Sequence, residues 1–168
     1  MSLELYFLRS SEQKIVTDML YYSQELDTKG STLSQNPELD IYHTFYGLTS
    51  KDLGLYAMQN AEVCGAIWSR KLNNEEIPFI NIAVKPPFRD NGVGSFMMQQ
   101  FIEESSALYE ALRVDLSKND KNLHFFKKFG FEIEQDGEQK VLMKKTLQYK
   151  EVHRPSDGYD PRKWMGDI

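Results

Sequence analysis

The stretch of this chain with the clearest chemical potential is Arg89-Asp90-Asn91-Gly92-Val93-Gly94. It follows a β-like apolar run, residues 77–84, and precedes a helical pattern that starts near Ser95. The glycines let the backbone turn tightly, and the following helix offers its unpaired amides and the positive end of its dipole. This combination predicts a phosphate-binding loop that needs no metal. The alternative is a plain strand-to-helix turn, because an isolated glycine pattern of this kind is weak evidence.

Cysteine and histidine offer little further chemistry. Cys64 is the only cysteine, so the sequence supports neither an intramolecular disulfide nor a cysteine-based metal site. It lies in a strand-like apolar run, which favours a buried structural thiol over a nucleophile. The histidines His43, His124 and His153 show no ligand spacing with one another. We therefore expect no metal.

The length and charge of the chain narrow its class. Its 168 residues fit one globular domain, which we place at residues 1–149, followed by a tail at residues 150–168. A net charge of -5 argues against nucleic acid as a partner. No apolar run reaches membrane-spanning length and the first residues do not resemble a secretory signal, so we expect a cytoplasmic protein. The tail is either a mobile terminus or a segment that docks on the domain or on a second copy in a homodimer.

The elements that would position the loop are separated by turn signals and by changes in hydrophobic period. The first part of the chain is expected to form a strand at 3–8, a helix capped by Ser10 or Ser11, a loop at 28–37 and a helical or irregular piece at 39–46. A hairpin of strands at 53–59 and 63–70 and the strand at 77–84 follow, and then a helix of about four turns from Ser95 with apolar positions as far as Leu112. The last elements are a strand at 113–117, a helix at 119–129 and two final strands at 131–133 and 140–147. The hairpins predict antiparallel pairing.

Two motifs at a suitable separation resemble the GNAT superfamily, the GCN5-related N-acetyltransferases. The run Val84-Lys85-Pro86-Pro87-Phe88, together with the glycine-containing loop, is similar to the family's V-x-P-x-x-R-G-x-G-x-G. The run Asn119-Asp120-Lys121-Asn122-Leu123-His124-Phe125-Phe126-Lys127-Lys128-Phe129-Gly130-Phe131 is similar to its N-x-x-A-x-x-x-Y-x-K-x-G-F. The resemblance covers residues 3–147 in element order. It implies an α/β (α+β) fold with a central mixed, mostly antiparallel sheet of about six or seven strands, flanked by about four helices.

The resemblance also implies acetyl-CoA as cosubstrate. Its pyrophosphate would lie on the backbone amides of the loop, with Arg89 beside them. Its pantetheine arm would bind free backbone groups of the strand before the loop, where that strand diverges from the strand at Val114. The residues expected to contact the coenzyme are Ile82, Ala83, Val84, Arg89, Asp90, Asn91, Gly92, Val93, Gly94, Ser95, Asn119 and Phe126.

Three positions depart from the family motifs. Asp90 replaces a glycine and brings a carboxylate to the expected anion site, although its side chain can point to solvent. Asn122 replaces an alanine, which is a modest change. Phe126 stands where the family carries the tyrosine often assigned as general acid, and it has no hydroxyl to protonate the leaving thiolate. The tyrosine-acid mechanism is therefore not carried over to this chain.

Direct transfer needs a neutral amine, and deprotonating a lysine-like amine at pH 7 costs about 4.6 kcal/mol. In the superfamily a carboxylate near the fourth strand often assists through water. The nearby acids here are Glu75 and Glu76, of which we favour Glu76 as the general base; the alternative is that both are solvated loop charges. Asn81 could order a water but is a poor base. The oxyanion would be met by a backbone N–H in the region of Ala83 and Val84.

We therefore expect an N-acetyltransferase that moves acetyl directly from acetyl-CoA to a primary amine of a small molecule or protein. The acceptor region, about residues 23–50, favours cationic acceptors without naming one. One alternative is a catalytically weak coenzyme A-binding regulatory or interaction module, suggested by Phe126 and by the lack of a clear base. Another is a nucleotide-binding fold that uses the loop for a different phosphate ligand.

Overall fold

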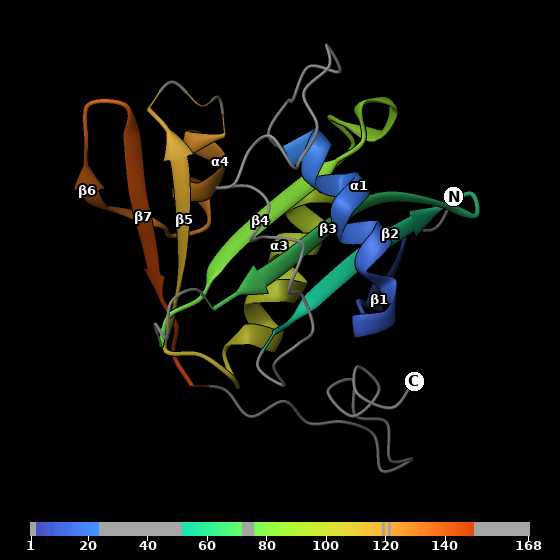
Figure 1. Ribbon diagram of the computed structural model, residues 1–168, viewed down its shortest axis with the longest axis horizontal. Coiled ribbons are helices and arrows are strands. Elements are labelled where there is room, and N and C mark those ends of the chain that lie inside the picture. The colour runs from blue at the N-terminus through green and yellow to red at the C-terminus, as the bar shows by residue number, and fades with distance from the viewer. Residues whose placement is uncertain (1–2, 24–51, 72–75, 119, 121, 150–168) are drawn as a thin grey trace.

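The fold is built on one seven-stranded sheet (Figure 1). The computed structural model describes residues 3–23, 52–71, 76–118, 120 and 122–149. The strands are β1 (Glu4–Phe7), β2 (Gly54–Gln59), β3 (Glu62–Arg70), β4 (Phe79–Val84), β5 (Ala111–Ser117), β6 (Glu132–Asp136) and β7 (Lys140–Thr146). They lie in the order β1-β2-β3-β4-β5-β7-β6, and among these strands the β4–β5 pair alone is parallel. This confirms the expected mixed, mostly antiparallel sheet.

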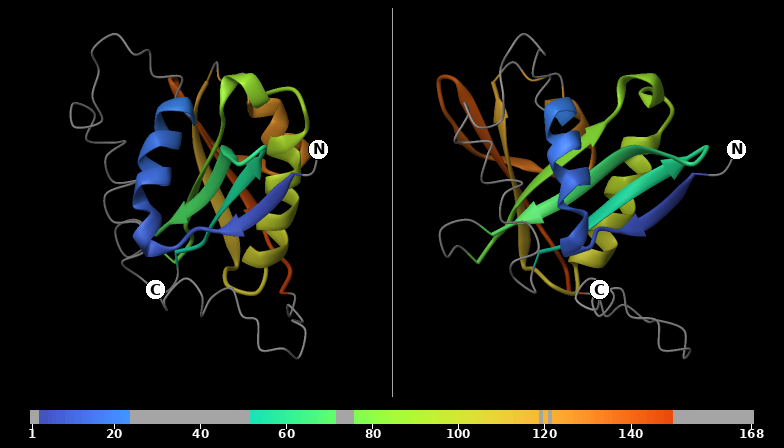
Figure 2. Two further views of the ribbon diagram at one scale, coloured as in Figure 1. Left: turned by 90° about the vertical axis from the view of Figure 1, so that its right-hand side faces the viewer. Right: turned by 45° about the vertical axis from the view of Figure 1, so that its right-hand side comes forward.

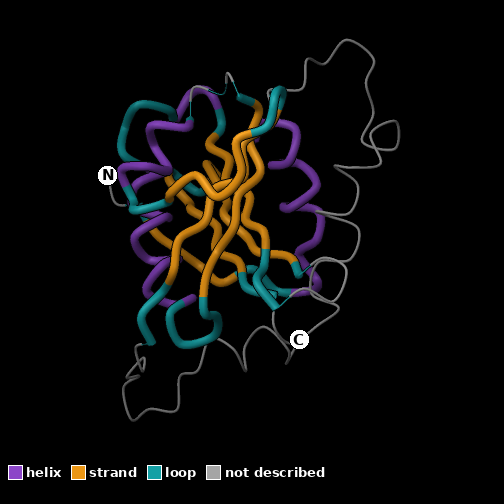
Figure 3. The backbone as a smooth tube through the Cα atoms, turned by 90° about the vertical axis from the view of Figure 1, so that its left-hand side faces the viewer, coloured by secondary structure: helices purple, strands orange, loops and turns teal. Residues whose placement is uncertain are grey.

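Helices cover both faces of the sheet (Figures 2 and 3). Helix α1 (Gln13–Ser23) packs on β3 and β4 from one face, whereas α3 (Val93–Ser105) and α4 (Leu123–Lys128) lie on the other. Two short 3-10 turns, η1 (Ser10–Glu12) and η3 (Pro86–Phe88), precede α1 and the glycine loop. Within the described ranges there are three α-helices, fewer than the expected four or so. None of them is long and apolar enough to cross a membrane.

Helix α3 is shorter at its end than its apolar pattern predicted. It begins at Val93 and ends at Ser105 instead of continuing to Leu112. The N–H of Tyr109 donates to the carbonyl of Ser105 at 2.9 Å, in a turn that leads into β5. Leu112 is therefore a strand residue of the core. The expectation was wrong here because a leucine at this position fits both the helical spacing after Phe101 and the alternation of β5.

The later boundaries also shift. Helix α4 begins at Leu123, not at residue 119. Before it, the N–H of Asp120 donates to the carbonyl of Ser117 at 2.9 Å, which is not an α-helical bond. The strand expected at 131–133 is β6, which lies slightly later, and Phe131 before it is a buried core residue. The hairpin of β2 and β3 is confirmed. The expected loop at 28–37, the piece at 39–46 and the tail lie outside the described residues.

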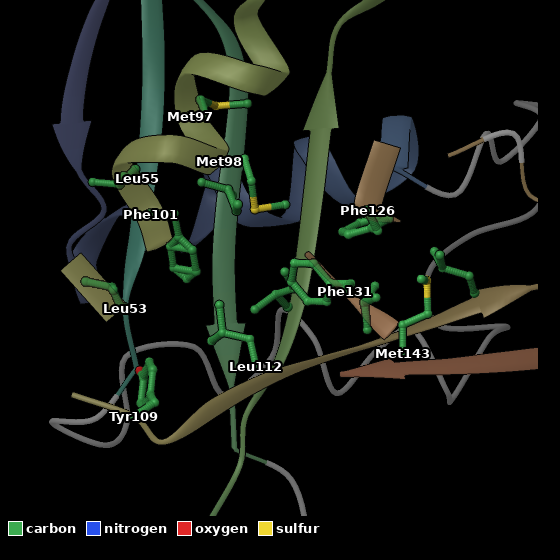
Figure 4. Close-up of a cluster of buried hydrophobic side chains, with 14 of the residues drawn as sticks. Leu53, Leu55, Met97, Met98, Phe101, Tyr109, Leu112, Phe126, Phe131 and Met143 are labelled. Carbon is green, nitrogen blue, oxygen red and sulfur yellow. The ribbon is translucent and has the colours of Figure 1, made fainter. Parts of the chain in front are cut away.

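Two hydrophobic cores lie on the two faces of the sheet. The larger core, under α3 and α4, contains these labelled side chains in Figure 4: Leu53, Leu55, Met97, Met98, Phe101, Tyr109, Leu112, Phe126, Phe131 and Met143. The smaller core, under α1, consists of Leu8, Val16, Met19, Ala66, Trp68 and Ala83. Each large apolar side chain buried in this way stabilises the fold by about 1.5–3 kcal/mol. The cores therefore fix the helices on the sheet that carries the site.

A buried polar cluster joins the strands at the end of the sheet where β4 begins. Arg70 and Asp52 form a buried ion pair. Ser69 Oγ lies 3.0 Å from the hydroxyl of Tyr109 and accepts a hydrogen bond from the N–H of Leu53 at 3.1 Å. Burial raises the pKa of Tyr109 well above its ordinary value. The cluster links the start of β2, the end of β3 and the chain just before β5, far along β4 from the glycine loop.

Candidate functional site

Strands β4 and β5 pair at a single point. Phe79 is opposite Arg113, whose N–H donates to the carbonyl of Pro78 at 3.0 Å. In contrast, every residue of β4 pairs with β3, from Phe79 opposite Arg70 to Val84 opposite Gly65. Beyond Phe79 the two parallel strands therefore diverge (Figure 1). We name this separation the split; it opens toward the end of β4 that leads into the glycine loop.

The register of β4 decides which backbone groups face the split. The N–H of Lys85 donates to the carbonyl of Cys64 at 2.8 Å, so this residue belongs to a hydrogen-bonded pair with β3. Hydrogen-bonded and non-hydrogen-bonded pairs alternate in an antiparallel ladder, so the backbone of Ala83 also faces β3. The backbone groups of Ile82 and Val84 face the split. Two of the three residues predicted to bind the pantetheine arm thus have this orientation.

Arg89 is anchored at the open end of the split. Its Nε donates a hydrogen bond to the carbonyl of Val84 at 2.8 Å. The bond holds a positive charge between the end of β4 and the glycine loop. It also occupies the carbonyl of Val84, so the N–H of this residue is the group that can meet a ligand.

The loop itself has the backbone shape of an anion site. Asp90 and Gly92 both have positive φ angles, 65° and 81°. Gly92 is the N-cap of α3, and its carbonyl accepts the first helical hydrogen bond from the N–H of Phe96 at 3.0 Å. The N–H groups of residues 93–95 in the first turn have no acceptor within the helix. They are donors for an anion at the positive end of the helix dipole.

The positive φ of Asp90 explains why the family motif has glycine at this position. A left-handed backbone favours glycine, and aspartate is one of the few other residues that adopts it readily. Asp90 is exposed, as the sequence interpretation allowed. The chain can therefore keep the loop geometry but has a carboxylate at the edge of the anion site.

Phe125 contacts the loop from the other side of the split. A Cβ on Gly94 would lie 3.6 Å from the ring of Phe125 and 3.8 Å from the side chain of Val84. Since Phe125 belongs to α4, which follows β5, its ring reaches across the split on the α3 face. The sequence motifs alone predict no role for Phe125. The available signal was its four-residue spacing from Phe129, whose ring centroid lies 5.1 Å away.

Phe126 is part of the hydrophobic core. It is only 2% exposed and packs edge-on against Phe125 and Phe131, with ring centroids 5.5 and 5.4 Å apart. This packing explains why an aromatic ring is kept at the position where the family carries tyrosine. Asn119, the other residue of this motif with a predicted coenzyme contact, lies outside the described residues.

The predicted base is remote from the open part of the split. Glu76 precedes β4, and the split opens only beyond Phe79. Its side chain is 86% exposed, and the Nζ of Lys71 lies 3.6 Å from its carboxylate. A catalytic role for Glu76 therefore stays a prediction and would have to act through water. Glu75 lies outside the described residues.

The sequence and fold both match one protein family. The acetyltransferase (GNAT) family matches residues 19–131 of the chain. This match spans well over half of the chain, and it includes β4, the glycine loop, the split and α4. The chain belongs to the GNAT family and is an N-acetyltransferase. No curated protein shows significant sequence similarity to it.

Solved structures show the same fold at low sequence identity. A GNAT-family acetyltransferase from Streptococcus pneumoniae is 19% identical, with a TM-score of 0.65 over 87% of this chain and 99% of its own. PaiA N-acetyltransferase from Thermoplasma acidophilum, in complex with coenzyme A, is 15% identical, with a TM-score of 0.64 over 88% of this chain and 100% of its own. YncA from Salmonella typhimurium, a putative acetyltransferase with its cofactor acetyl-CoA, is 14% identical, with a TM-score of 0.66 over 94% of this chain and 99% of its own.

Proposed function

We propose that this enzyme transfers acetyl from acetyl-CoA directly to a primary amine of a small molecule or protein. The observation that carries the proposal is the continuity of the split with the glycine loop at the end of β4. One extended ligand with a pyrophosphate at one end and a thioester at the other can bind both. The coenzyme A and acetyl-CoA complexes of the PaiA and YncA proteins support this choice of donor.

The donor would bind mainly through backbone groups. The amides from Asp90 to Ser95 would hold the pyrophosphate, and Arg89 would supply a fixed positive charge. The pantetheine arm would lie in the split beside Ile82, Ala83 and Val84. Asn119 would contact the coenzyme near the start of the last helix. Hydrogen bonds to charged groups contribute roughly 1.5–3 kcal/mol each, so a few of them support micromolar binding after the costs of association.

The chemical step would be attack by a neutral amine on the thioester carbon. A C–N bond forms, the oxyanion meets the N–H of Val84, and the C–S bond then breaks. Acyl transfer to the enzyme's own thiol is disfavoured, because Cys64 is buried and its Sγ lies 3.4 Å from the carbonyl of Ala57. Burial also raises the pKa of the Cys64 thiol.

The proton path follows from the side chains that line the site. Phe126 supplies no acid, so water would protonate the leaving thiolate. Glu76 is the predicted base through water; in that role Glu76→Gln would lower kcat by a factor of about 100 or more. If the carboxylate is only a solvated loop charge, the same variant would leave kcat unchanged.

Phe126→Tyr tests the proton path. We expect unchanged turnover, because water already protonates the thiolate. The new hydroxyl would lie among packed aromatic rings, since the side chain at this position is only 2% exposed. Phe131→Tyr, in the same cluster, controls for the effect of a hydroxyl on packing. A large gain in turnover for Phe126→Tyr alone would contradict protonation by water and would show that a missing acid limits the enzyme.

A catalytically weak coenzyme A-binding module is the second candidate. Phe126 and the exposed position of Glu76 favour it. Free thiol release from acetyl-CoA, measured with a panel of primary amines, separates the two functions. Amine-dependent release supports the transferase, whereas acetyl-CoA binding without release supports the module.

Cellular location, oligomeric state and domain boundary stay predictions. We propose a cytoplasmic enzyme with a domain at residues 1–149 and a tail at residues 150–168, which would dock on the domain or on a second copy. Light scattering of the full chain and of a chain that ends at Leu147 tests the dimer. An unchanged mass and unchanged activity would favour a tail without either role.

A further inference from the structure

Asn81 is the one polar residue of β4, whose sequence is otherwise Phe79, Ile80, Ile82, Ala83 and Val84. It is only 9% exposed. Its side-chain amide makes no hydrogen bond with the part of the chain that the structure describes. Its nitrogen and oxygen are not among the fully enclosed, unpartnered side-chain atoms of the described residues, so the amide can still reach a ligand. A nearly buried amide that keeps this access is placed to hydrogen-bond a polar ligand.

The position of Asn81 relates this amide to the split. Asn81 pairs with Trp68 of β3, and Trp68 and Ala83 both belong to the core under α1. Alternate residues of a strand point to opposite faces, so the side chain of Asn81 is on the α1 face. Its neighbour Ile82 contributes to the core under α3 and turns its backbone groups to the split.

This arrangement separates the two reactants. The phosphate-binding loop leads into α3, so the coenzyme would enter the split from the α3 face. An acceptor that attacks the thioester carbon needs an approach that the coenzyme does not occupy, which is the α1 face. Asn81 lies on that face one residue from Ile82, about 3.3 Å along the strand.

We propose that Asn81 is the acceptor-positioning residue of this enzyme, an inference that rests on the proposed function. Its Oδ1 accepts a hydrogen bond from an N–H of the primary amine and aims the nitrogen lone pair at the thioester carbon. The nitrogen forms the C–N bond, the C–S bond breaks, and the proton lost by nitrogen reaches the departing thiolate through water. Asn81 takes up no proton, because an amide is not basic at neutral pH.

A neutral amide suits a site that must hold an uncharged amine. A carboxylate in the same place would favour the ammonium form and raise the pKa of the bound amine. That shift would add to the cost of deprotonation. Oδ1 accepts the same hydrogen bond without a negative charge. The side chain therefore selects for an N–H donor at the reacting atom and not for a cation.

The test uses the full chain, acetyl-CoA and butylamine, a primary amine with no other polar group, and follows thiol release. Asn81→Leu is similar in size but cannot accept a hydrogen bond, so it is expected to lower kcat/KM for butylamine about tenfold to a hundredfold. Acetyl-CoA affinity is expected to stay unchanged. Asn81→Asp retains an acceptor oxygen and is expected to keep the KM for butylamine at or below that of the unmodified chain. Asn81→Ala replaces the leucine variant if that variant does not fold.

Ser69→Ala is the matched control. It removes a buried polar group from the neighbouring strand, where Ser69 bonds to Leu53 and lies 3.0 Å from the hydroxyl of Tyr109. This variant is expected to lower the melting temperature and leave the KM for butylamine unchanged. A merely structural Asn81 would behave in the same way.

Three results would overturn the inference. The first is butylamine kinetics of Asn81→Leu equal to those of the unmodified chain. The second is a loss of acetyl-CoA affinity as large as the loss of kcat/KM. The third is an unmodified chain that binds acetyl-CoA but shows no thiol release that depends on butylamine. This result would overturn the role of Asn81 but would still support the coenzyme site. Failure to bind acetyl-CoA would instead remove the proposed function itself.

Discussion

Asp90 combines the geometry of the loop with the wrong charge for its proposed ligand. Its φ of 65° is the conformation for which the family motif uses glycine. Asp90→Gly should therefore relieve backbone strain and remove a negative charge from the edge of the pyrophosphate site. We expect acetyl-CoA affinity to rise about two- to tenfold. Calorimetric titration at low salt measures this change, and the gain should shrink as salt screens the charge.

Asp90→Asn separates the charge from the strain. Asparagine also adopts a left-handed backbone readily, so this variant removes the charge alone. It should reproduce the gain in affinity without a gain in thermal stability. Equal affinity of the unmodified chain and both variants would mean that the coenzyme does not approach Asp90.

At the level of single residues, the sequence located the loop but not the direction of each backbone group. Arg89 and the glycines carry a recognisable pattern, and Gly92 indeed has the positive φ that the pattern requires. The different orientations of Ala83 and Val84 follow from the register with β3, which depends on residues about twenty positions earlier. The contact of Phe125 with Gly94 likewise depends on how α4 packs against α3. No local pattern specifies such packing.

Charged side chains form an ion-pair cluster across strands β5, β7 and β6. Arg113 of β5 donates to both carboxylate oxygens of Glu134 at 2.9 and 3.4 Å, and the Nζ of Lys144 of β7 lies 3.7 Å from the same group. The hydrogen bond from Arg113 is the main cause that lowers the pKa of Glu134, and the charges of both cations act in the same direction. This ion-pair cluster joins β6, an edge strand, to the half of the sheet that borders the split.

This lowered pKa predicts a pH dependence of stability. Because the folded-state pKa lies below the unfolded-state value, the contribution of Glu134 is complete above the unfolded-state pKa and is lost as the pH falls through the folded-state pKa. Glu134→Gln should lower the free energy of unfolding by up to about 1 kcal/mol at pH 7. The difference from the unmodified chain should vanish at a pH well below the folded-state pKa, where the carboxyl group is protonated in both states. Urea unfolding at both pH values measures it.

Glu132→Gln is the control for this prediction. Glu132 is an exposed acid on the same strand, so its loss should change stability little at either pH. A pH-independent effect of Glu134→Gln would show that packing, and not the charge of the carboxylate, stabilises this edge.

At the level of elements, hydrophobic period identified the strands better than the ends of the helices. Strands β2, β3 and β4 lie within a few residues of their predicted bounds because turns and prolines flank them. The end of α3 was missed because the residues around it, Ser105-Ser106-Ala107, contain no glycine or proline to mark a stop. The chain turns there because its leucines pack better in β5. That preference comes from the tertiary core and not from local propensity.

In the whole molecule, the sheet separates the two proposed binding directions. The loop and Phe125 lie toward α3 and α4, whereas Asn81 lies toward α1. Strands β4 and β5 share a single bridge, and in the proposed mechanism both reactants would meet beyond it without a covalent enzyme intermediate. The family could be identified from two sequence motifs. The acceptor could not, because its contacts depend on segments brought together only by the fold.

Calorimetric titration of the full chain with acetyl-CoA and with acetyl-pantetheine tests whether the loop at residues 89–95 holds a pyrophosphate. We predict micromolar binding of acetyl-CoA, and binding at least about tenfold weaker for acetyl-pantetheine, which has no pyrophosphate. Absence of acetyl-CoA binding at sub-millimolar concentration, or equal affinity for the two compounds, would contradict the account.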